Sequence, residues 1–315
     1  MKIKFLITGA SGMLGKSLIN QLRIKKYSFL APSSKELNLL DPYSIKKYMF
    51  KKKPNYIVHL AGYVGGIGAN MNDPIRFLHS NMIMGMNLID VAHKMEIKNF
   101  LNIGSSCIYP AKENKPMNES KLLGGEFEKT NEGYALAKLS IIKFCEYVSK
   151  SKDYNYFSLI PCNIYGPNDN FDEKTGHVVS SLIDRIYRAK KNNSKDVEIW
   201  GTGKSKREFI YVDDVSRAIL KFLFNKKLIK DNLYWLNIGM GTDLSIKSLF
   251  LKIAKIIGYN GKIINNLNKP DGAKRKLLNI KKAKKLGWHP KINLETGLKK
   301  TINWYVKQIK NNKIR

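Results

Sequence analysis

Short apolar runs alternate with longer helical patterns along the first half of the chain. Apolar runs occupy 2–8, 27–31, 56–59, 100–103 and 155–163. Runs of this length predict buried strands, whereas apolar positions three or four residues apart predict the helices between them. Strands and helices in alternation are typical of an α/β fold with a parallel sheet. The pattern therefore predicts a Rossmann-type doubly wound parallel sheet.

The alternation continues after residue 163 with a different spacing. Strands are expected at 197–200 and 233–238, with helices at 177–190, 245–257 and 293–308. Because no repeat or low-complexity linker separates the two parts, we expect a smaller α/β domain interwoven with the first. We assign 1–163 and 205–238 to a cofactor-binding domain, and 164–204 and 239–315 to a substrate-binding domain.

Composition narrows the class of protein. The 315 residues carry a formal net charge of +31, but the lysines are scattered, so we expect no nucleic acid partner. No apolar run approaches the roughly 18 residues that a membrane-spanning helix needs. Three widely spaced cysteines suggest neither a disulfide framework nor a metal site. We expect a cytoplasmic protein without a metal or a membrane partner, whose positive field helps to collect a phosphorylated substrate.

A glycine-rich turn directly follows the first predicted strand and opens a helix. Gly9, Gly12 and Gly15 form a GxxGxxG pattern. Gly9 permits the tight turn, Gly12 lets the backbone approach a pyrophosphate, and Gly15 lets the helix pack closely on the strand. Since helix N-termini attract phosphate, this position predicts a dinucleotide cofactor.

The end of the second predicted strand indicates which dinucleotide is bound. A fold that prefers NAD usually places an acid here for the ribose 2′-hydroxyl. This chain has Ser33, Ser34 and Lys35 before its first acid, Glu36. Hydroxyls and an ammonium suit a 2′-phosphate, so we predict NADP(H) as the cofactor.

Two segments, 104–110 and 134–138, carry the candidate chemistry. Tyr134 and Lys138 are four residues apart in a predicted helix and therefore share one face. A close ammonium favours phenolate, so we expect Lys138 to lower the pKa of Tyr134. Ser105 ends a predicted strand and can donate to the same carbonyl oxygen as Tyr134. Ser, Tyr and Lys in this order form the active-site signature of short-chain dehydrogenase/reductases.

With these motifs in place, the whole chain resembles the extended short-chain dehydrogenase/reductases, and most specifically the GDP-L-fucose synthase family. The motifs that carry the resemblance lie at 64–67, 104–110, 165–171, 200–203, 207–209, 269–272 and 275–276. The resemblance implies an NADP-dependent enzyme that is both isomerase and oxidoreductase. A GDP-4-keto-6-deoxy-mannose would be epimerised at C3 and C5 and then reduced at C4 to GDP-L-fucose.

The family's catalytic roles fall on five residues of this chain. Ser105 and Tyr134 would stabilise the enolate oxygen, because C3 and C5 both flank the C4 carbonyl. Cys107 and His177 match the family's base and acid, which act on opposite faces of the ring. Tyr134 would then protonate the C4 oxygen, while Lys138 holds the nicotinamide ribose.

The same resemblance assigns the binding residues and the partner. The cofactor residues are Gly9, Ser11, Gly12, Met13, Leu14, Gly15, Ser33, Ser34, Lys35, Asp41, Leu60, Ala61, Gly62, Lys138, Pro161, Asn163, Ile164 and His177. The GDP-sugar residues are Ser105, Ser106, Cys107, Tyr134, Asn163, Val178, Arg185, Trp200, Arg207 and Lys276. Some family members have arginines where this chain has Ser11 and Ser34. Helices at 74–94 and 131–150 match those that pair in the family's homodimers. We expect His59 to be a packed core residue and Asn81 to brace the site.

Three other functions stay open on the sequence alone. The chain could be a GDP-6-deoxy-4-keto-heptose epimerase or reductase, since one extra hydroxymethyl group is decided by pocket shape. It could be a nucleotide-sugar 4-epimerase or dehydratase, although dehydratases usually have an acid pair where this chain has Cys107-Ile108. A non-catalytic NADP-binding regulator would be expected to lack Tyr134 or Lys138, and both are present.

Overall fold

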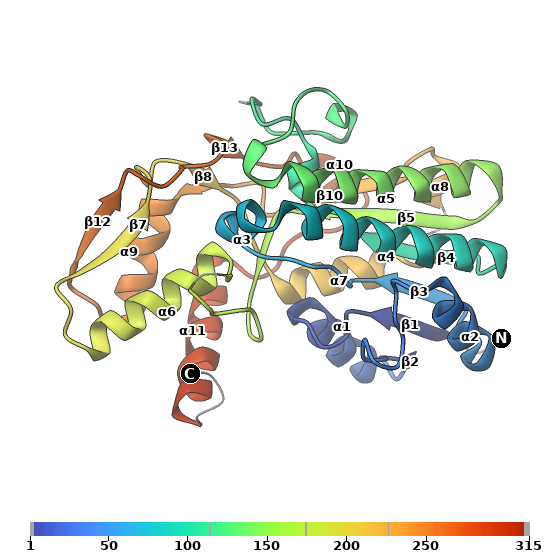
Figure 1. Cartoon of the computed structure of the whole chain (residues 1–315), viewed down its shortest axis with the longest axis horizontal. Coiled ribbons are helices and arrows are strands. Elements are labelled where there is room, and N and C mark those ends of the chain that lie inside the picture. Colours follow the sequence, from blue (N-terminus) through green and yellow to red (C-terminus); the bar gives the residue numbers. More distant parts are fainter. Residues whose placement is uncertain (1–2, 114, 174, 226, 312–315) are drawn as a thin grey trace.

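A six-stranded parallel sheet forms the centre of the larger lobe. The structure, a computed structural model, describes residues 3–113, 115–173, 175–225 and 227–311. The strand order is β10-β5-β4-β3-β1-β2, and all five pairings are parallel (Figure 1). The strands are β1 (Lys4–Thr8), β2 (Ser28–Leu30), β3 (Tyr56–His59), β4 (Asn99–Ile103), β5 (Asn155–Pro161) and β10 (Trp235–Ile238).

Helices cover both faces of this sheet. One face packs against α1 (Met13–Ile24), α7 (Val212–Phe222) and the short α8 (Lys227–Lys230), and the other against α2 (Pro42–Lys52), α4 (Pro74–Lys94) and α5 (Glu132–Ser151). Side chains alternate along a strand, so Phe5 and Ile7 join the first core while Leu6 joins the second. Burial on both faces explains why the strands read as continuous apolar runs.

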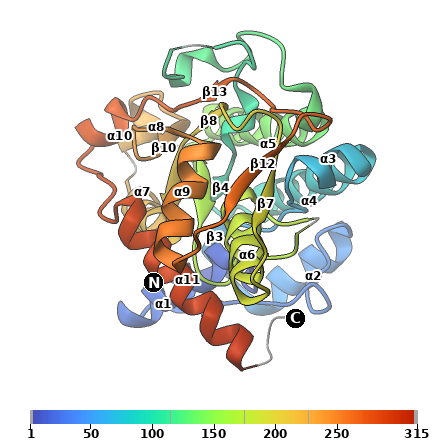
Figure 2. The ribbon, with the colours of Figure 1, turned by 90° about the vertical axis from the view of Figure 1, so that its left-hand side faces the viewer.

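The smaller lobe contains three short sheets and three main helices around its own core. Its sheets are β7 (Asp196–Trp200) with β12 (Lys262–Asn266), β6 (Asn163–Tyr165) with β9 (Phe209–Tyr211), and β11 (Leu244–Ser245), β8 (Lys206–Arg207) and β13 (Arg275–Lys276) together. Figure 2 shows α6 (Val178–Lys191), α9 (Ile246–Ile257) and α11 (Leu294–Lys310) on the side of this lobe that faces the viewer. Two short helices complete the chain, α3 (Ile67–Asn72) and α10 (Lys281–Lys285).

The chain crosses between the lobes more than once. It leaves the large sheet after β5, forms β6 to β9 in the smaller lobe, and returns to the sheet as β10. The predicted Rossmann-type sheet with an interwoven α/β lobe is therefore confirmed. The predicted domain boundaries stay a prediction. In the part of the chain that is described, no helix combines the length and apolarity needed to cross a membrane.

Two predicted elements differ from the structure. The run 155–163 divides at Cys162, whose N–H donates to Ile238 O at 3.0 Å, whereas the next N–H, that of Asn163, donates to Glu208 O at 3.3 Å. The backbone thus changes partner from one sheet to another within two residues. The motif at 207–209 predicts a helix soon after Arg207, but the strand β9 precedes the helix α7 there.

The strand order places a ligand crevice beside β1. The chain runs from β1 to β2 on one side and then to β3 on the other side of β1. Ligands bind at such switch points, outside the carboxyl ends of the strands. The two loops meet closely there, because a Cβ on Gly9 (φ +68°) would lie 2.6 Å from Ala61 N. Only glycine fits this backbone position.

Candidate active site

The N-terminus of α1 is open where a dinucleotide is expected. Gly12 precedes the helix, and among the described residues no side chain caps the free N–H groups. A Cβ on Gly12 would meet Gly9 O at 3.4 Å, an ordinary contact, so the backbone has room on its outer side. A Cβ on Gly15 would instead collide with Gly9 and Ala10. Uncapped N–H donors beside an open backbone fit a pyrophosphate. Ser11 is exposed, and Met13 and Leu14 are half-buried in the first turn.

In the turn after β2, the Glu36 carboxylate is bonded within the turn, whereas the Lys35 ammonium is exposed. Ser33 donates to the Glu36 carboxylate from its N–H (2.8 Å) and its hydroxyl (2.9 Å). These two bonds lower the pKa of Glu36 and hold its charge within the turn. Ser34 and Lys35 are exposed and available to a 2′-phosphate. Asp41, one of the predicted cofactor residues, caps α2 by accepting the N–H groups of Tyr43 (2.9 Å) and Ser44 (3.2 Å).

The loop after β3, which contains Leu60, Ala61 and Gly62, is braced from behind by Asn81. The Asn81 amide accepts Tyr63 N–H at 2.9 Å and donates to Tyr63 O at 3.0 Å. A Cβ on Gly62 would lie 3.0 Å from Asn81 Oδ1 and 3.6 Å from Lys138 Nζ, so this backbone passes close to the Lys138 ammonium.

His59 is a core residue, as the sequence predicts. Its ring bonds to Thr8 Oγ1 at 2.8 Å inside the sheet. Burial, with a smaller effect of the Lys138 charge, lowers the pKa of His59 to about 3. The ring therefore stays neutral at physiological pH.

Tyr134 and Lys138 extend from α5 toward the carboxyl end of β4. Lys138 Nζ donates to Ile103 O at 3.0 Å and lies 5.8 Å from the centre of the Tyr134 ring. Burial lowers the pKa of Lys138 to about 8. Burial also raises the pKa of Tyr134, and Cys107 raises it further. The predicted lowering of the Tyr134 pKa is wrong for this site, because the desolvation cost of the phenolate outweighs the attraction of the ammonium. Tyr134 rests as a neutral phenol, the form that donates a proton.

Ser105 and Cys107 lie directly after β4, at a turn of 3₁₀ helix, η1 (Ser106–Ile108). Ser105 Oγ accepts Cys107 N–H at 3.4 Å. Burial raises the pKa of the Cys107 thiol, while the charge of Lys276, the Ser105 hydroxyl and the charge of Lys138 act in the opposite direction. Cys107 is thus within electrostatic reach of both Tyr134 and Lys138. The structure brings Cys107 together with Tyr134 and Lys138, the residues predicted to serve the reduction.

Lys276 reaches this centre from β13 and is held by Glu128. Lys276 Nζ lies 2.5 Å from Glu128 Oε2, and the two side chains are 11% and 8% exposed. Glu128 Oε1 also accepts Ala273 N–H (3.1 Å) and Thr130 Oγ1 (3.0 Å). Burial raises the pKa of Glu128, but the charge and hydrogen bond of Lys276 more than offset this and the pKa is lowered. Lys276 therefore has a fixed, ionised partner.

Arg207 lies on the other side of the same loop. Its guanidinium donates to Ala273 O at 2.5 Å and to Asp271 O at 3.4 Å. A Cβ on Gly272 (φ +70°) would lie 2.8 Å from both the Arg207 and the Glu128 side chains. The backbone at 271–273 is thus clamped between a cation that binds its carbonyls and a carboxylate that binds its N–H.

The remaining GDP-sugar residues line the smaller lobe. Trp200, at the end of β7, is 37% exposed, and Lys269 Nζ lies 5.4 Å from its ring centre. The ring is therefore not a core side chain, and it has a free area for stacking. Arg185 on α6 donates to Glu198 O at 2.6 Å, and Val178 begins the same helix. Asn163 donates from its amide to Glu208 O at 2.8 Å, with Pro161 and Ile164 on either side of the crossing between the sheets.

His177 stands immediately before α6. Its Nδ1 lies 3.4 Å from Asp169 Oδ1. Burial lowers the pKa of His177, but the hydrogen bond and charge of Asp169 more than offset this and the pKa is raised. The segment joins the loop after β3, because Gly66 N–H donates to Thr175 O at 3.2 Å. His177 thus approaches the crevice from the smaller lobe.

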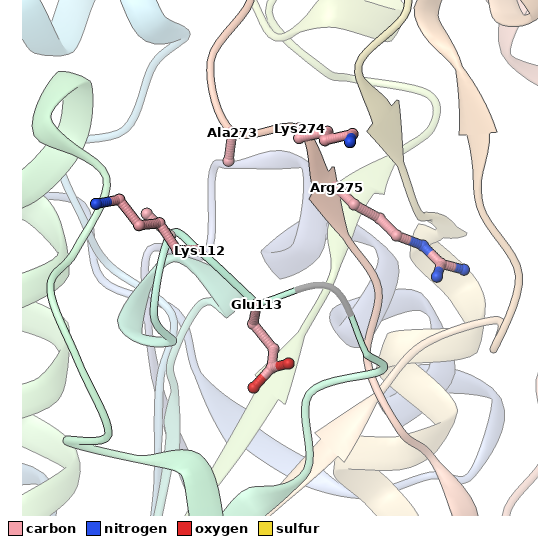
Figure 3. Close-up of a pocket in the computed structure, with 6 residues that line it drawn as sticks. Lys112, Glu113, Ala273, Lys274 and Arg275 are labelled. Carbon is pink, nitrogen blue, oxygen red and sulfur yellow. The ribbon is translucent and has the colours of Figure 1, made fainter.

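Two cavities lie beside the predicted site, one at Tyr134 and one near Lys276. One, of about 400 Å³, lies between α3, α4 and the start of α5, and Tyr134 and Phe77 form part of its wall. The other, of about 390 Å³, lies between the segment 111–113 and the segment 273–275. Figure 3 shows Lys112 and Glu113 on one side of it and Ala273, Lys274 and Arg275 on the other. This second cavity shares a wall with the loop that carries Lys276.

Three acidic residues of the site were not predicted as site residues. Asp169 lies in the motif at 165–171, which supports the family resemblance but gives no role to this residue. Glu128 lies near the end of a polar loop with no recognisable pattern. Glu208 is buried and accepts Gly241 N–H (2.6 Å) and Leu278 N–H (2.8 Å), and burial raises its pKa to about 7. Glu128 and Glu208 bond to residues distant in sequence, and Asp169 meets His177 only because their loop folds back on itself; a single sequence offers no signal for such pairs.

Comparisons with known proteins agree with this geometry. The model of the NAD dependent epimerase/dehydratase family matches residues 5–239. The chain is 42% identical to a GDP-L-colitose synthase of Yersinia pseudotuberculosis over 98% of this chain and all of that one. It is 40% identical to a GDP-L-fucose synthase of Azorhizobium caulinodans over 96% of each. The fold is also similar to that of a GDP-D-glycero-L-gluco-heptose synthase from Campylobacter jejuni, solved in the presence of NADPH. The TM-score is 0.89 and the sequence identity 28%, over 97% of this chain and 98% of that one. The predicted resemblance is confirmed.

The turn after β2 leads to a prediction on cofactor choice. Lys35→Ala should raise the KM for NADPH about fivefold, since an exposed ion pair contributes up to about 1 kcal/mol. The KM for NADH should not change, because NADH has no 2′-phosphate. Steady-state kinetics at low salt, with Lys47→Ala on α2 as the control, measure both values. Equal weakening of NADPH and NADH would contradict the role of Lys35.

Proposed function

Since this chain belongs to the NAD dependent epimerase/dehydratase family, we propose that it is an NADP-dependent GDP-sugar epimerase-reductase. Its substrate would be GDP-4-keto-6-deoxy-D-mannose, epimerised at C3 and C5 and reduced at C4 to GDP-L-fucose. The observation that carries this proposal is the position of Cys107. A thiol suited to proton abstraction lies in electrostatic contact with the Tyr134–Lys138 pair suited to reduction. One bound carbonyl can therefore serve both stages.

Epimerisation needs an acidified proton, a base and an acid. The Ser105 hydroxyl and the neutral Tyr134 phenol would donate to the C4 oxygen and stabilise the enolate that forms on it. Cys107 would remove the proton at C3 and then at C5, with Lys276 and Lys138 favouring its thiolate form. His177, whose pKa is raised, would deliver a proton to the opposite face.

Reduction uses the groups that remain. NADPH, when bound, supplies the hydride to C4. The open N-terminus of α1 would hold its pyrophosphate, and Lys35 with Ser34 its 2′-phosphate. Tyr134 would protonate the C4 oxygen, and Lys138, fixed by Ile103 O, would hold the nicotinamide ribose and keep the phenol in place. The GDP end would meet Trp200, Arg185, Arg207 and Lys276.

Relatives favour two close alternatives for the sugar. The similarity to a GDP-L-colitose synthase and to a GDP-D-glycero-L-gluco-heptose synthase suggests that the product could be GDP-L-colitose or a GDP-heptose in place of GDP-L-fucose. All share the GDP group and the 4-keto carbon, so the residues above serve each of them. A panel of GDP-4-keto sugars with NADPH in D₂O, with products identified by NMR, tests the choice. If the reduced product of every sugar carries no deuterium at C3 or C5, the protein reduces C4 without epimerisation and is a simple 4-reductase.

The role of Tyr134 can be tested by removing its hydroxyl. Tyr134→Phe should lower NADPH-dependent reduction by about 10²-fold or more and leave NADPH binding unchanged, because only the transferable proton is lost. Turnover and fluorescence titration with NADPH measure these two quantities. Tyr156→Phe is the control, since its hydroxyl also donates in a buried position, to Ile97 O at 2.8 Å, but lies in another core cluster. Near-normal reduction by Tyr134→Phe would exclude Tyr134 as the proton donor.

Cys107 should separate the two stages. Cys107→Ser keeps the size but replaces the thiol with a far weaker base, so deuterium exchange at C3 and C5 should stop. Slow NADPH oxidation to an unepimerised sugar should persist, because Ser105, Tyr134 and Lys138 remain. Cys145→Ser makes the same change in the core and should exchange normally. Exchange by Cys107→Ser at the wild-type rate would place the base elsewhere.

The proposal includes a homodimer formed through α4 and α5. Leu136 and Tyr147 lie on one outward stripe of α5 and are 39% and 60% exposed. Large exposed apolar side chains in a row are typical of an interface.

Tyr147→Glu should therefore shift the protein from dimer to monomer, because a buried carboxylate on this stripe would face its own copy. Light scattering after size exclusion measures the mass. Phe50→Glu, at an equally exposed position on α2, should leave the dimer intact. A monomeric wild type would overturn this part of the proposal.

A further inference from the structure

The loop between β6 and α6 holds Asp169 and His177 face to face. Its two arms are in contact, since a Cβ on Gly176 would lie 2.6 Å from Asn170 O, and Gly176 N–H donates to Asp172 O at 2.8 Å. Asn168, which has a positive φ of 68°, accepts Lys16 Nζ of α1 at 3.1 Å. The loop is thus anchored to the helix that opens the cofactor site. The separation of Asp169 and His177 is fixed by backbone contacts.

Asp169 is a buried carboxylate within a surface loop. Its side chain is 4% exposed, whereas that of His177 is 40% exposed. Asp169 Oδ1 accepts Asn170 N–H at 2.8 Å and lies 3.4 Å from His177 Nδ1. Asp169 Oδ2 is buried and has no hydrogen-bond partner within the described residues. A buried carboxylate with one oxygen lacking a hydrogen bond lowers the stability of the fold. A purely structural role therefore explains Asp169 poorly.

We propose that Asp169 is a positioning residue that holds the His177 ring through Nδ1–H and turns Nε2 toward the sugar. This inference rests on the proposed function, in which His177 is the acid of epimerisation. A histidine with one nitrogen bonded has a fixed tautomer, so the proton that leaves is the one on Nε2. After the transfer, Nδ1–H stays with the carboxylate. Before the second carbon reacts, Nε2 takes up a proton from solvent and Cys107 releases the proton it removed, while the ring keeps the same orientation.

The charges around His177 support this assignment. Asp169 raises the pKa of His177 against the effect of burial, which favours the protonated ring. Asp172, on the same loop, accepts Thr175 N–H and Oγ1 at 2.8 Å. The Arg185 guanidinium on α6 donates to Glu198 O, and the Lys16 ammonium on α1 donates to Asn168 Oδ1. Both cations are thus bonded to groups other than His177. Asp169 is the carboxylate that faces the ring.

The test uses Asp169→Asn, which removes the charge but keeps an oxygen that can accept Nδ1–H. Without the carboxylate the pKa of His177 should fall, so the acid loses its proton at a lower pH. Inversion at C3 and C5 should drop about tenfold at pH 8, and its alkaline limb should move to lower pH. Exchange of deuterium should continue, because Cys107 is untouched, and so should reduction. Asp172→Asn is the matched control and should behave as the wild type.

NMR of histidine ring nitrogens in the full-length protein gives a second, independent readout. It should show Nδ1–H and a raised His177 pKa in the wild type, and a lower pKa in Asp169→Asn. Unchanged titration together with unchanged inversion in Asp169→Asn would overturn the inference. If the wild type neither exchanges nor inverts any GDP-4-keto sugar, the proposed function fails. The NMR titration would still decide whether Asp169 holds His177.

Discussion

The hydrogen bond from Lys138 Nζ to Ile103 O joins helix α5 to the carboxyl end of β4. Ser105 and Cys107 follow β4 directly, while Tyr134 lies one turn before Lys138, so this bond sets the position of one pair relative to the other. It also solvates an ammonium that has lost its water. Even so, burial lowers the pKa of Lys138 to about 8. A lysine with a pKa near this value is still mostly charged at neutral pH, and its charge is sensitive to what binds beside it.

Besides the bond of Lys138, the site depends on partners for its other buried charges. Glu128 lies between Lys276 and the backbone at 271–273, and Arg207 clamps the same backbone from the other side. Asp271 adds a second carboxylate that acts on Arg207, so the two cations of this cluster face two carboxylates. Removing water makes such an arrangement costly unless every group is bonded. Lys276 still favours the thiolate of Cys107, and in the proposed function the loop that carries Lys276 would also meet the diphosphate of the substrate.

Local patterns could be predicted from the sequence, and pairs formed by folding could not. The bounds of α4 were predicted as 74–94 because the helix begins at Pro74 after Asp73, which caps it, and apolar positions recur along it. Gly9 could be predicted because its turn is read from adjacent residues. Glu128 with Lys276, and Asp169 with His177, depend on where loops close in three dimensions. The pKa of Tyr134 was predicted in the wrong direction, because the sequence shows a neighbouring ammonium but not the loss of water around a phenol.

The resting protonation states follow from these environments and constrain how the site works. The Tyr134 phenol is neutral, the Cys107 thiol has a raised pKa, and Asp169 favours a protonated His177. These directions favour acids that hold their protons and a base that still has to be formed. The charges of Lys276 and Lys138 favour the Cys107 thiolate against the effect of burial, so in the proposed function the balance between these cations and the loss of water decides how readily the base forms.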